Sequence, residues 1–350
     1  MGVVDIMRPC RIGLALTAAV LAATLAAALG STSAFAQTPI RFSLDGGFEG
    51  PIAPFLVAID KGYYKAERLD VSIDPAANYL EPIARVASGS YDMGFADINA
   101  LISFRNANAE TPIKAVFMVY NRPAYAIIAR KSRGVEKPSD LNGKKLGAPA
   151  ADSAFAQWKI FAKANGIDTA KVVIENIGIP VRGPMLAAGQ VDAVTGLSFS
   201  SYVNLKDRGV PVNDIIVLLM ADHGVDLYGN AIIVNPKFAA AKPQVVKAFL
   251  RAFQKGLIET IRSPASAVQS VLKRNDQAQK PVELERLRIA IKDNILTGEV
   301  KANGFGRIDT ARFNKSIDQL ALTTTFKSRP KPSDIFDASF LPPVTKPKTR

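Results

Sequence analysis

Residues 41–55 read RFSLDGGFEGPIAPF, an apolar strand pattern followed by a glycine-rich polar loop and the start of a helix. A second strand pattern follows at Leu69–Ile73, and residues 89–97, GSYDMGFAD, run through a third strand into a carboxylate. In open α/β sheets, ligands bind at the carboxyl ends of the strands. The stretch therefore predicts a sheet whose first loop, residues 45–51, forms one wall of a binding site.

The alternation of apolar and amphipathic segments continues through most of the chain. Segments that are apolar throughout are typical of strands covered by helices on both faces, and their alternation with helices predicts parallel sheets built from right-handed crossovers. The expected strands are Ile40–Leu44, Leu69–Ile73, Met93–Ala96, Lys114–Val119, Tyr125–Arg130, Lys145–Ala148, Val172–Ile177, Ala193–Leu197, Ile215–Met220 and Asn230–Val234. The expected helices between them are Pro54–Lys61, Glu81–Ser88, Ile98–Asn106, Phe155–Asn165 and Val181–Ala188.

The pattern changes after Asn235. The last third of the chain has long amphipathic segments and no strand pattern, which predicts a helical end to the fold. From Arg329 the chain is rich in proline and lysine, so we expect it to follow the surface or to be disordered, with a flexible tail at 341–350. The expected helices are Val245–Arg262, Pro264–Asn275, Pro281–Ile295 and Asp309–Leu322.

The first 36 residues have the pattern of an export signal. Arg8 and Arg11 precede the apolar run Ile12–Leu29, and the small residues at 34–36 form a cleavage site after Ala36. This pattern predicts a signal peptide at 1–36 and a mature protein in the periplasm. A membrane anchor is the alternative, because the apolar run is just long enough to span a bilayer.

Cysteine and histidine are nearly absent, which excludes several kinds of chemistry. Cys10 is the only cysteine and would be removed with the signal, so the mature chain has no disulfide and no thiol nucleophile. His223 is the only histidine, which excludes zinc hydrolase and Cys/His catalysis. The sequence also has no phosphate-binding loop and no Gly-x-Ser-x-Gly elbow. We therefore expect neither catalysis nor a cofactor.

The net charge of +13 falls to +12 when Arg8, Arg11 and Asp5 leave with the signal. Lysine and arginine are spread along the chain without a basic helix interleaved with aromatic residues, so nucleic acid is not an expected partner. A solvated basic surface is the simplest interpretation, and electrostatic steering of an anionic ligand is the alternative.

Several motifs point to a known family. The order of strand, loop and helix at 41–55, the segment GSYDMGFAD at 89–97, LNGKKLGA at 141–148 and AGQVDA at 188–193 occur together. This arrangement resembles the nitrate/sulfonate/taurine-type solute-binding proteins of ABC importers, which include binders of thiamine-pyrimidine precursors. Many such proteins carry a bulky aromatic residue where this chain has Gly46-Gly47, which implies a roomier or displaced pocket.

The resemblance implies a type II periplasmic binding protein fold. Its two α/β lobes, each a mostly parallel sheet flanked by helices, are joined by two hinge crossovers, expected near Tyr120–Ile127 and Tyr228–Val234. Lobe one is then 38–124 plus 232–340, and lobe two is 125–231.

Polar and aromatic residues at strand ends are the candidate ligand contacts. Glycines let a ligand approach the backbone, Phe48 could stack on a flat ligand, and Asp45 and Glu49 could accept hydrogen bonds from it. Arg122 could instead form an inter-lobe salt bridge, and Asp97 could simply cap a helix. The expected ligand-binding residues are Asp45, Gly46, Gly47, Phe48, Glu49, Asn78, Asp97, Asn99, Tyr120, Arg122, Tyr125, Ser153, Phe155, Arg182, Ser198, Phe199, Asp226 and Tyr228.

The resemblance implies the periplasmic substrate-binding component of an ABC importer, which captures a small organic solute by hinge closure. Arg122, Arg182 and the helix start near Ser153 favour an organic anion such as a sulfonate or aromatic carboxylate. The carboxylates of the first loop, Asp97 and Asp226 favour the alternative, an aminopyrimidine-type thiamine precursor. Of the two, the organic anion is the ligand that we expect.

The expected partners are the solute and an inner-membrane ABC permease with its ATPase, and we expect a monomer. Two further alternatives stay open. One is a periplasmic sensor or scavenger without a transporter. The other is an enzyme of pyrimidine synthesis on the same fold, although the cysteine-rich, iron-linked motif of that branch is absent here.

Overall fold

The computed structural model describes residues 1–2 and 37–347, and it divides the chain into two units, 1–37 and 38–350. The predicted signal peptide and its cleavage site at Ala36 lie outside the described residues. Within the described part, none of the helices has both the length and the apolar character that crossing a membrane requires. The fold described below is that of the second unit.

The first sheet has the strand order β2-β1-β3-β10-β4. β1 pairs in parallel with both β2 and β3, whereas β10 is antiparallel to both β3 and β4. Four of its five strands therefore run in the same direction. The strands are β1 (Thr38–Ser43), β2 (Leu69–Asp74), β3 (Met93–Asp97), β4 (Lys114–Met118) and β10 (Asn230–Val234).

The second sheet repeats this plan with the order β7-β6-β8-β5-β9. β6 is parallel to β7 and β8, and β5 is antiparallel to β8 and β9. The strands are β5 (Tyr125–Arg130), β6 (Lys145–Gly147), β7 (Val173–Glu175), β8 (Ala193–Leu197) and β9 (Ile215–Leu219).

All ten expected strands are confirmed, and both sheets are mostly parallel. The exceptions are β5 and β10, each the first strand after the chain crosses from one sheet to the other. Neither of these strands follows a helical crossover within its own sheet, so the rule that makes successive strands parallel does not apply to them. The predicted lobe boundaries near residues 124 and 231 remain predictions.

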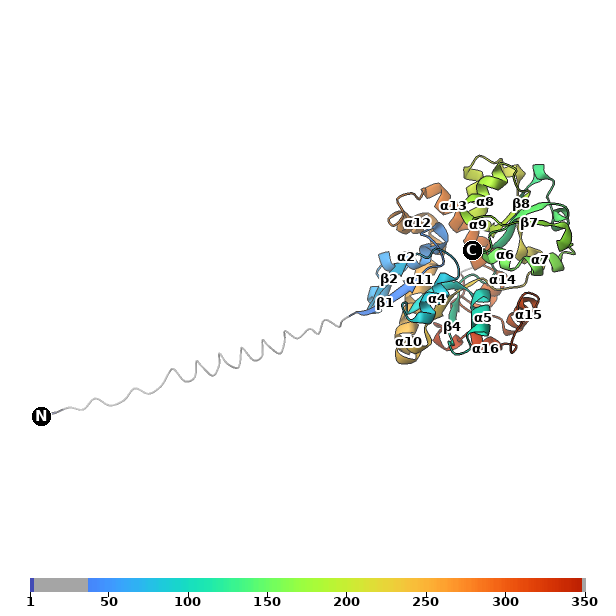
Figure 1. Ribbon diagram of the computed structural model, residues 1–350. Coiled ribbons are helices and arrows are strands. Elements are labelled where there is room, and N and C mark those ends of the chain that lie inside the picture. The colour runs from blue at the N-terminus through green and yellow to red at the C-terminus, as the bar shows by residue number, and fades with distance from the viewer. Residues whose placement is uncertain (3–36, 348–350) are drawn as a thin grey trace. The chain divides into compact units, whose positions relative to one another are not determined.

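The helices flank the sheets and fill the C-terminal part of the chain (Figure 1). The α-helices are α2 (Ala53–Asp60), α3 (Tyr63–Ala66), α4 (Glu81–Ser88), α5 (Ile98–Ala107), α6 (Ser153–Ala156), α7 (Trp158–Ala164), α8 (Ile179–Ala187), α9 (Ser198–Asp207), α10 (Pro236–Ala241), α11 (Pro243–Arg262), α12 (Pro264–Leu272), α13 (Lys280–Ala290), α14 (Gly298–Asn303), α15 (Thr310–Leu320) and α16 (Pro332–Ile335). The shorter helical turns are η1 (Gly50–Ile52), η2 (Lys131–Arg133), η3 (Pro138–Leu141), η4 (Thr169–Lys171), η5 (Val212–Asp214), η6 (Met220–Asp222), η7 (Ile291–Ile295, a π-helix) and η8 (Ala338–Phe340).

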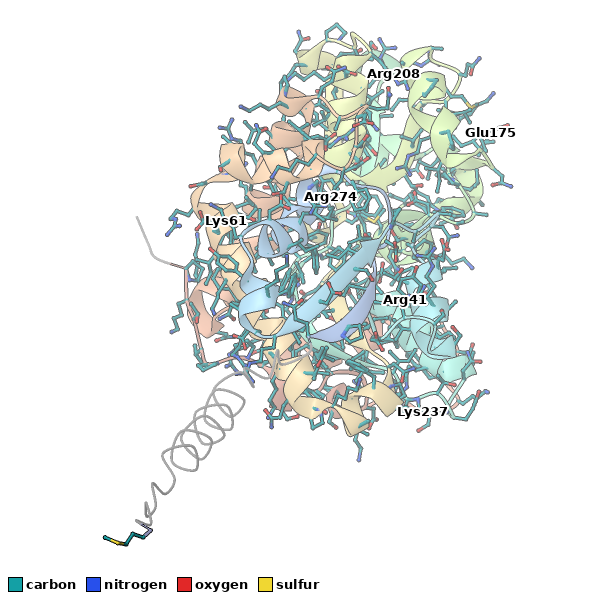
Figure 2. All side chains as sticks on the ribbon, turned by 90° about the vertical axis from the view of Figure 1, so that its left-hand side faces the viewer. Arg41, Lys61, Glu175, Arg208, Lys237 and Arg274 are labelled. Carbon is teal, nitrogen blue, oxygen red and sulfur yellow. The ribbon has the colours of Figure 1, made fainter. Side chains whose placement is uncertain are left out.

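Helix α11 packs against α2 and anchors the core next to the first sheet. Its Phe249 and Phe253 meet Phe42 of β1 and Phe55 of α2, with ring centroids 5.2 and 4.4 Å apart. Gly256 allows this close approach, because a Cβ there would lie 2.4 Å from the Pro54 carbonyl oxygen. Beside α2, Arg274 pairs with Asp60 at 2.8 Å, close to Lys61 (Figure 2).

The proline-rich end follows the surface as far as it is described. The carbonyl of Thr345 accepts a hydrogen bond from the Phe305 amide at 3.0 Å, and its hydroxyl lies 3.1 Å from Nε2 of Gln254. Of the two expectations for this end, contact with the surface therefore holds up to Thr345. Residues 348–350 lie outside the described part.

Candidate functional site

A cavity of about 370 Å³ opens between the loops of the two sheets. From the first sheet it is lined by the segments that follow β1, β2 and β3, and from the second by those that follow β6 and β8, together with α8 and α9. Eleven expected residues meet here: Asp45, Gly46, Gly47, Glu49, Asn78, Asp97, Tyr120, Tyr125, Ser153, Arg182 and Phe199. That these residues bind a ligand remains a prediction.

Asp45 is the first residue of the polar loop, and its environment is unusual for a carboxylate. Its Oδ2 accepts a hydrogen bond from Nδ2 of Asn230, the first residue of β10, at 2.6 Å. Burial raises the pKa of the Asp45 carboxyl to about 7, and the nearby charges of Asp97 and Glu49 add to this shift. Asp45 can therefore exist in either protonation state near neutral pH.

Asp97 closes β3 and serves both roles that its position suggests. Its Oδ1 caps α5 by accepting hydrogen bonds from the amides of Asn99, at 2.7 Å, and Ala100, at 3.2 Å. Its Oδ2 accepts a hydrogen bond from the hydroxyl of Tyr125, and the residue also lines the cavity. Burial raises the pKa of the Asp97 carboxyl. Capping and cavity lining are thus not alternatives here.

Aromatic residues form another part of the wall. Tyr120 and Phe199 line the cavity. Together with Phe95, which does not line it, they make a chain of edge-on contacts, with ring centroids 5.2 Å and 6.2 Å apart. Tyr79, which the set of expected residues omitted, also lines the cavity. Burial and the negative charges of Asp97 and Asp152 raise the pKa of its hydroxyl to about 12, so this hydroxyl is a hydrogen-bond donor at all ordinary pH values.

On the side of the second sheet, Asp152 organises the wall. It caps the four-residue helix α6 through the amide of Ala154 at 3.2 Å, and it accepts a hydrogen bond from Oγ1 of Thr195 at 2.6 Å. The same carboxylate lies 3.2 Å from Nη1 of Arg182. The helix start near Ser153 is therefore occupied by a carboxylate, and the charge of Arg182 is balanced.

Helix α9 presents one polar face to the cavity. Ser201, Asn204 and Arg208 are spaced by about one helical turn and all line it. The Ser201 hydroxyl is buried and has no hydrogen-bond partner within the described residues. Arg208 is exposed just beyond α9, in the part of the molecule that also carries Glu175 (Figure 2), and forms no ion pair with any other described residue.

Seven expected residues lie outside the cavity lining. Phe48 packs on the core and Phe155 on a second cluster, while Asn99 sits behind the wall, where its Nδ2 reaches the Tyr228 carbonyl at 2.7 Å. Arg122 forms an ion pair with Asp222 instead. The remaining three are Ser198, whose buried hydroxyl has no partner among the described residues, Asp226, paired with Arg312 at 2.7 Å, and Tyr228, hydrogen-bonded to Glu299 at 2.7 Å.

Sequence reasoning missed several lining residues. Tyr79 and Asp152 each stand next to an expected residue. The sequence therefore identified the right segments but did not show that these side chains also point into the cavity. The polar face of α9 could have been found from the helical spacing of Ser201 and Arg208. The position of Asn230 at the start of a strand carried no such signal. The missed lining residues with polar side chains are Tyr79, Asp152, Ser200, Ser201, Asn204, Arg208 and Asn230.

Comparison with known protein families identifies the family of this chain. Residues 50–267, more than half of it, match the family described as NMT1/THI5 like. The chain belongs to the NMT1/THI5-like family. The resemblance inferred from the motifs at 41–55 and 188–193 is therefore confirmed.

Relatives of this NMT1/THI5-like chain include both binding proteins and synthases. A formylaminopyrimidine-binding protein of Halalkalibacterium halodurans is 28% identical over 242 residues, 67% of this chain and 72% of the relative. The riboflavin-binding protein RibY of Chloroflexus aurantiacus is 29% identical over 230 residues, 65% of this chain and 64% of the relative. A 4-amino-5-hydroxymethyl-2-methylpyrimidine phosphate synthase of Schizosaccharomyces pombe is 24% identical over 228 residues, covering 63% and 64%.

Solved structures show the same fold at low sequence identity. The alkanesulfonate-binding protein SsuA of Xanthomonas axonopodis pv. citri, bound to MOPS, superposes with a TM-score of 0.64 at 14% identity and covers 87% of this chain and 99% of its own. The nitrate-binding protein NrtA of Synechocystis PCC 6803 gives 0.61 at 11% identity, covering 87% of each chain. The two-lobed periplasmic binding protein fold is thus confirmed.

Proposed function

We propose that this protein is the solute-binding component of an ABC importer and that its ligand is a nitrogen heterocycle with hydrogen-bond donors. The observation that carries the proposal is the cavity between the two sheets, where Asp45, Glu49 and Asp97 converge from the first sheet. Carboxylates accept hydrogen bonds, and they complement N–H and amino groups. An aminopyrimidine-type solute has such groups at the edge of a flat ring.

The charges around the cavity weigh against an organic anion. The expectation of an anion relied on Arg122, Arg182 and the helix start near Ser153. Arg122 pairs with Asp222 away from the cavity, and Asp152 both balances Arg182 and caps the short helix α6. An anion would therefore meet the carboxylates of Asp45, Glu49 and Asp97, and like charges repel. Of the two arginines that line the described cavity, Arg208 alone forms no ion pair, and it lies at the exposed end of α9.

Two relatives support this choice of ligand class. The names of the Halalkalibacterium halodurans and Chloroflexus aurantiacus proteins give a formylaminopyrimidine and riboflavin as what they bind. Both ligands contain a nitrogen heterocycle. The aromatic wall formed by Tyr120 and Phe199 offers such a ring an apolar surface beside the carboxylates.

The mechanism that we propose is capture by closure, with no bond made or broken. A ligand in the cavity contacts loops of both sheets, so it stabilises the arrangement in which those loops are close. The relatives named as synthases make catalysis the alternative. Against it, no cysteine or histidine lines the described cavity. The export pattern at residues 1–36 supports a periplasmic location. The partner that we propose is an inner-membrane permease with its ATPase, and we propose that the protein acts as a monomer.

A thermal-shift screen of residues 37–350 tests the proposal. Tight binding raises the melting temperature by mass action, by an amount that grows with the ratio of ligand concentration to Kd. We expect 4-amino-5-hydroxymethyl-2-methylpyrimidine or riboflavin to raise it, and taurine, aryl sulfonates and aromatic carboxylates to leave it unchanged. If only the anions raise it, the heterocycle proposal is wrong. Recovery of the bound compound unchanged, checked by mass spectrometry, separates binding from catalysis.

A further inference from the structure

A cluster of buried charges lies behind the cavity, where α9, α13 and the loop before η1 meet. At its centre is Arg286 of α13, which lies outside the cavity lining. Its Nη1 is 2.6 Å from Oε1 of Glu283 and 3.4 Å from Oε1 of Glu49. Its Nη2 donates a hydrogen bond to Oδ1 of Asn204 in α9 at 2.5 Å. One guanidinium therefore joins three segments of the chain.

The contacts of this cluster fall into two groups. One group joins α13 to the loop before η1, and the other joins these segments to α9, which belongs with the second sheet. Glu283 accepts a hydrogen bond from the Gly50 amide at 2.6 Å, and a Cβ on Gly50 would lie 2.0 Å from the Glu283 carbonyl oxygen. The loop and α13 are thus packed directly against each other. The other contacts reach α9, the helix that follows β8 of the second sheet. Arg286 contacts Asn204, and Glu49 accepts a hydrogen bond from the Ser200 hydroxyl at 2.9 Å.

Burial makes this cluster sensitive to the loss of any member. The exposed fractions of Glu283 and Arg286 are 2% and 9%. A buried charge is tolerated only when it is paired and hydrogen-bonded, and removing one partner leaves the other uncompensated. Burial raises the pKa of the Glu283 carboxyl, while Arg286 and the Gly50 amide oppose that shift. Glu49 is more exposed and reaches the cavity, so it connects the cluster to the binding site.

We propose that Arg286 is a positioning residue for the ligand site and the centre of a closure latch. It holds the Glu49 carboxylate at the cavity and, through Asn204 and Ser200, ties α9 to the first-sheet loop. Opening of the cleft breaks the contacts of Arg286 with Asn204 and of Glu49 with Ser200. It leaves the Glu283 contacts intact. The latch rests on the proposed function only in that closure serves to capture a ligand.

An exposed ion pair between the same two helices supplies a matched control. Lys206 of α9 lies 2.7 Å from Glu285 of α13, but its side chain is 43% exposed and does not line the cavity. Exposed pairs contribute little, because water screens them. Lys206→Met removes a link between α9 and α13 without touching Arg286, so any effect specific to the latch is absent in this variant.

The test is the shape of the ligand-free protein in solution, measured by small-angle X-ray scattering on residues 37–350. We expect Arg286→Met and the double variant Ser200→Ala/Asn204→Ala to increase the radius of gyration, Arg286→Lys to restore most of the wild-type value, and Lys206→Met to change nothing. The double variant replaces residues of α9 only and leaves the Glu283–Arg286 pair in place, so it keeps the test valid if Arg286→Met fails to fold. An unchanged radius in the double variant overturns the latch.

The positioning role has its own readout. For 4-amino-5-hydroxymethyl-2-methylpyrimidine or riboflavin, we expect Arg286→Met to weaken binding by about tenfold or more, the effect of disturbing one charged hydrogen bond, although Arg286 does not line the cavity. Arg286→Lys should recover part of the affinity. Equal affinity in Arg286→Met and wild type overturns this role. If neither probe binds any variant, the proposed ligand class fails while the scattering result still decides the latch.

Discussion

The carboxyl of Asp45 shows how one buried residue links pH to stability. Its pKa of about 7 in the folded protein exceeds the ordinary value of 3.8, so the folded state holds a proton that the unfolded state releases. The contribution of this carboxyl to the free energy of unfolding is therefore fully present below about pH 4, and it is lost as the pH rises to about 7. Asp45→Asn removes the loss, because the amide does not ionise.

We therefore expect Asp45→Asn to be more stable than wild type at pH 8 by roughly 1–2 kcal/mol, a figure reduced from the full shift because the side chain keeps some contact with water. The advantage should shrink at pH 5. Urea unfolding of both proteins at the two pH values measures it. A pH-independent difference between the two proteins contradicts the assignment of the raised pKa to Asp45.

Gly196 in β8 is a residue whose missing side chain shapes the cavity. A Cβ there would lie 2.3 Å from the Ser201 hydroxyl oxygen and 3.1 Å from Cζ of Arg182. We expect Gly196→Ala to displace both side chains and to weaken ligand binding by about tenfold, on the order of the 1–3 kcal/mol typical of overpacking. Gly298→Ala is the control, since nothing lies within 4 Å of its Cβ position. Calorimetric titration that finds equal affinity in both variants contradicts this role.

Secondary-structure elements were the most predictable scale of this molecule. Apolar runs such as residues 125–130 and 193–197 predict buried strands, because strands covered on both faces are apolar throughout and the runs are too short for helices. Two predicted helices differ from the structure for local reasons. The one expected at 155–165 is divided at Gln157 into α6 and α7, and the one expected at 281–295 ends as a π-helix over its last turn. Apolar periodicity carries no signal for either change.

The N-terminus of α6 controls the charge of one cavity wall. Asp152 caps this helix and pairs with Arg182, so replacing the carboxylate with an amide should keep the cap and free the cation. We expect Asp152→Asn to bind an aryl sulfonate at least about tenfold more tightly than wild type, as expected for a newly available charged hydrogen bond. Asp168→Asn, which changes the cap of the distant η4, is the control. Titration showing no gain contradicts the balancing of Arg182 by Asp152.

At the scale of the whole molecule, the site could be predicted only in part, because pairing partners lie far apart in the sequence. The strand ends gave Asp45, Asp97 and Tyr125, since the carboxyl ends of parallel strands meet at one edge. Nothing in the sequence shows that Arg122 pairs with a residue 100 positions away. The direction of an arginine is set by the nearest carboxylate in the folded protein, and that depends on the packing of both sheets.

The two crossovers between the sheets are held by Arg312 of α15, and this contact supports a last prediction. Its guanidinium lies 2.9 Å from Glu299, donates to the Leu227 carbonyl at 2.8 Å and to Asn121 at 3.0 Å, and covers the Tyr228 ring at 4.1 Å. Asn121 belongs to one crossover and residues 227–228 to the other. Removing the arginine leaves Glu299, 14% exposed, with an uncompensated charge.

We expect Arg312→Met to lower the free energy of unfolding by about 3–5 kcal/mol, the cost of breaking one half of a buried, hydrogen-bonded pair. The matched control is Arg329→Met. It removes the exposed ion pair between Arg329 and Asp318, a residue of α15 like Arg312, and should cost less than about 1 kcal/mol. Urea unfolding of both variants measures the difference. Equal losses would mean that the crossovers are held by their apolar neighbours, such as Phe313, and that Arg312 merely covers them.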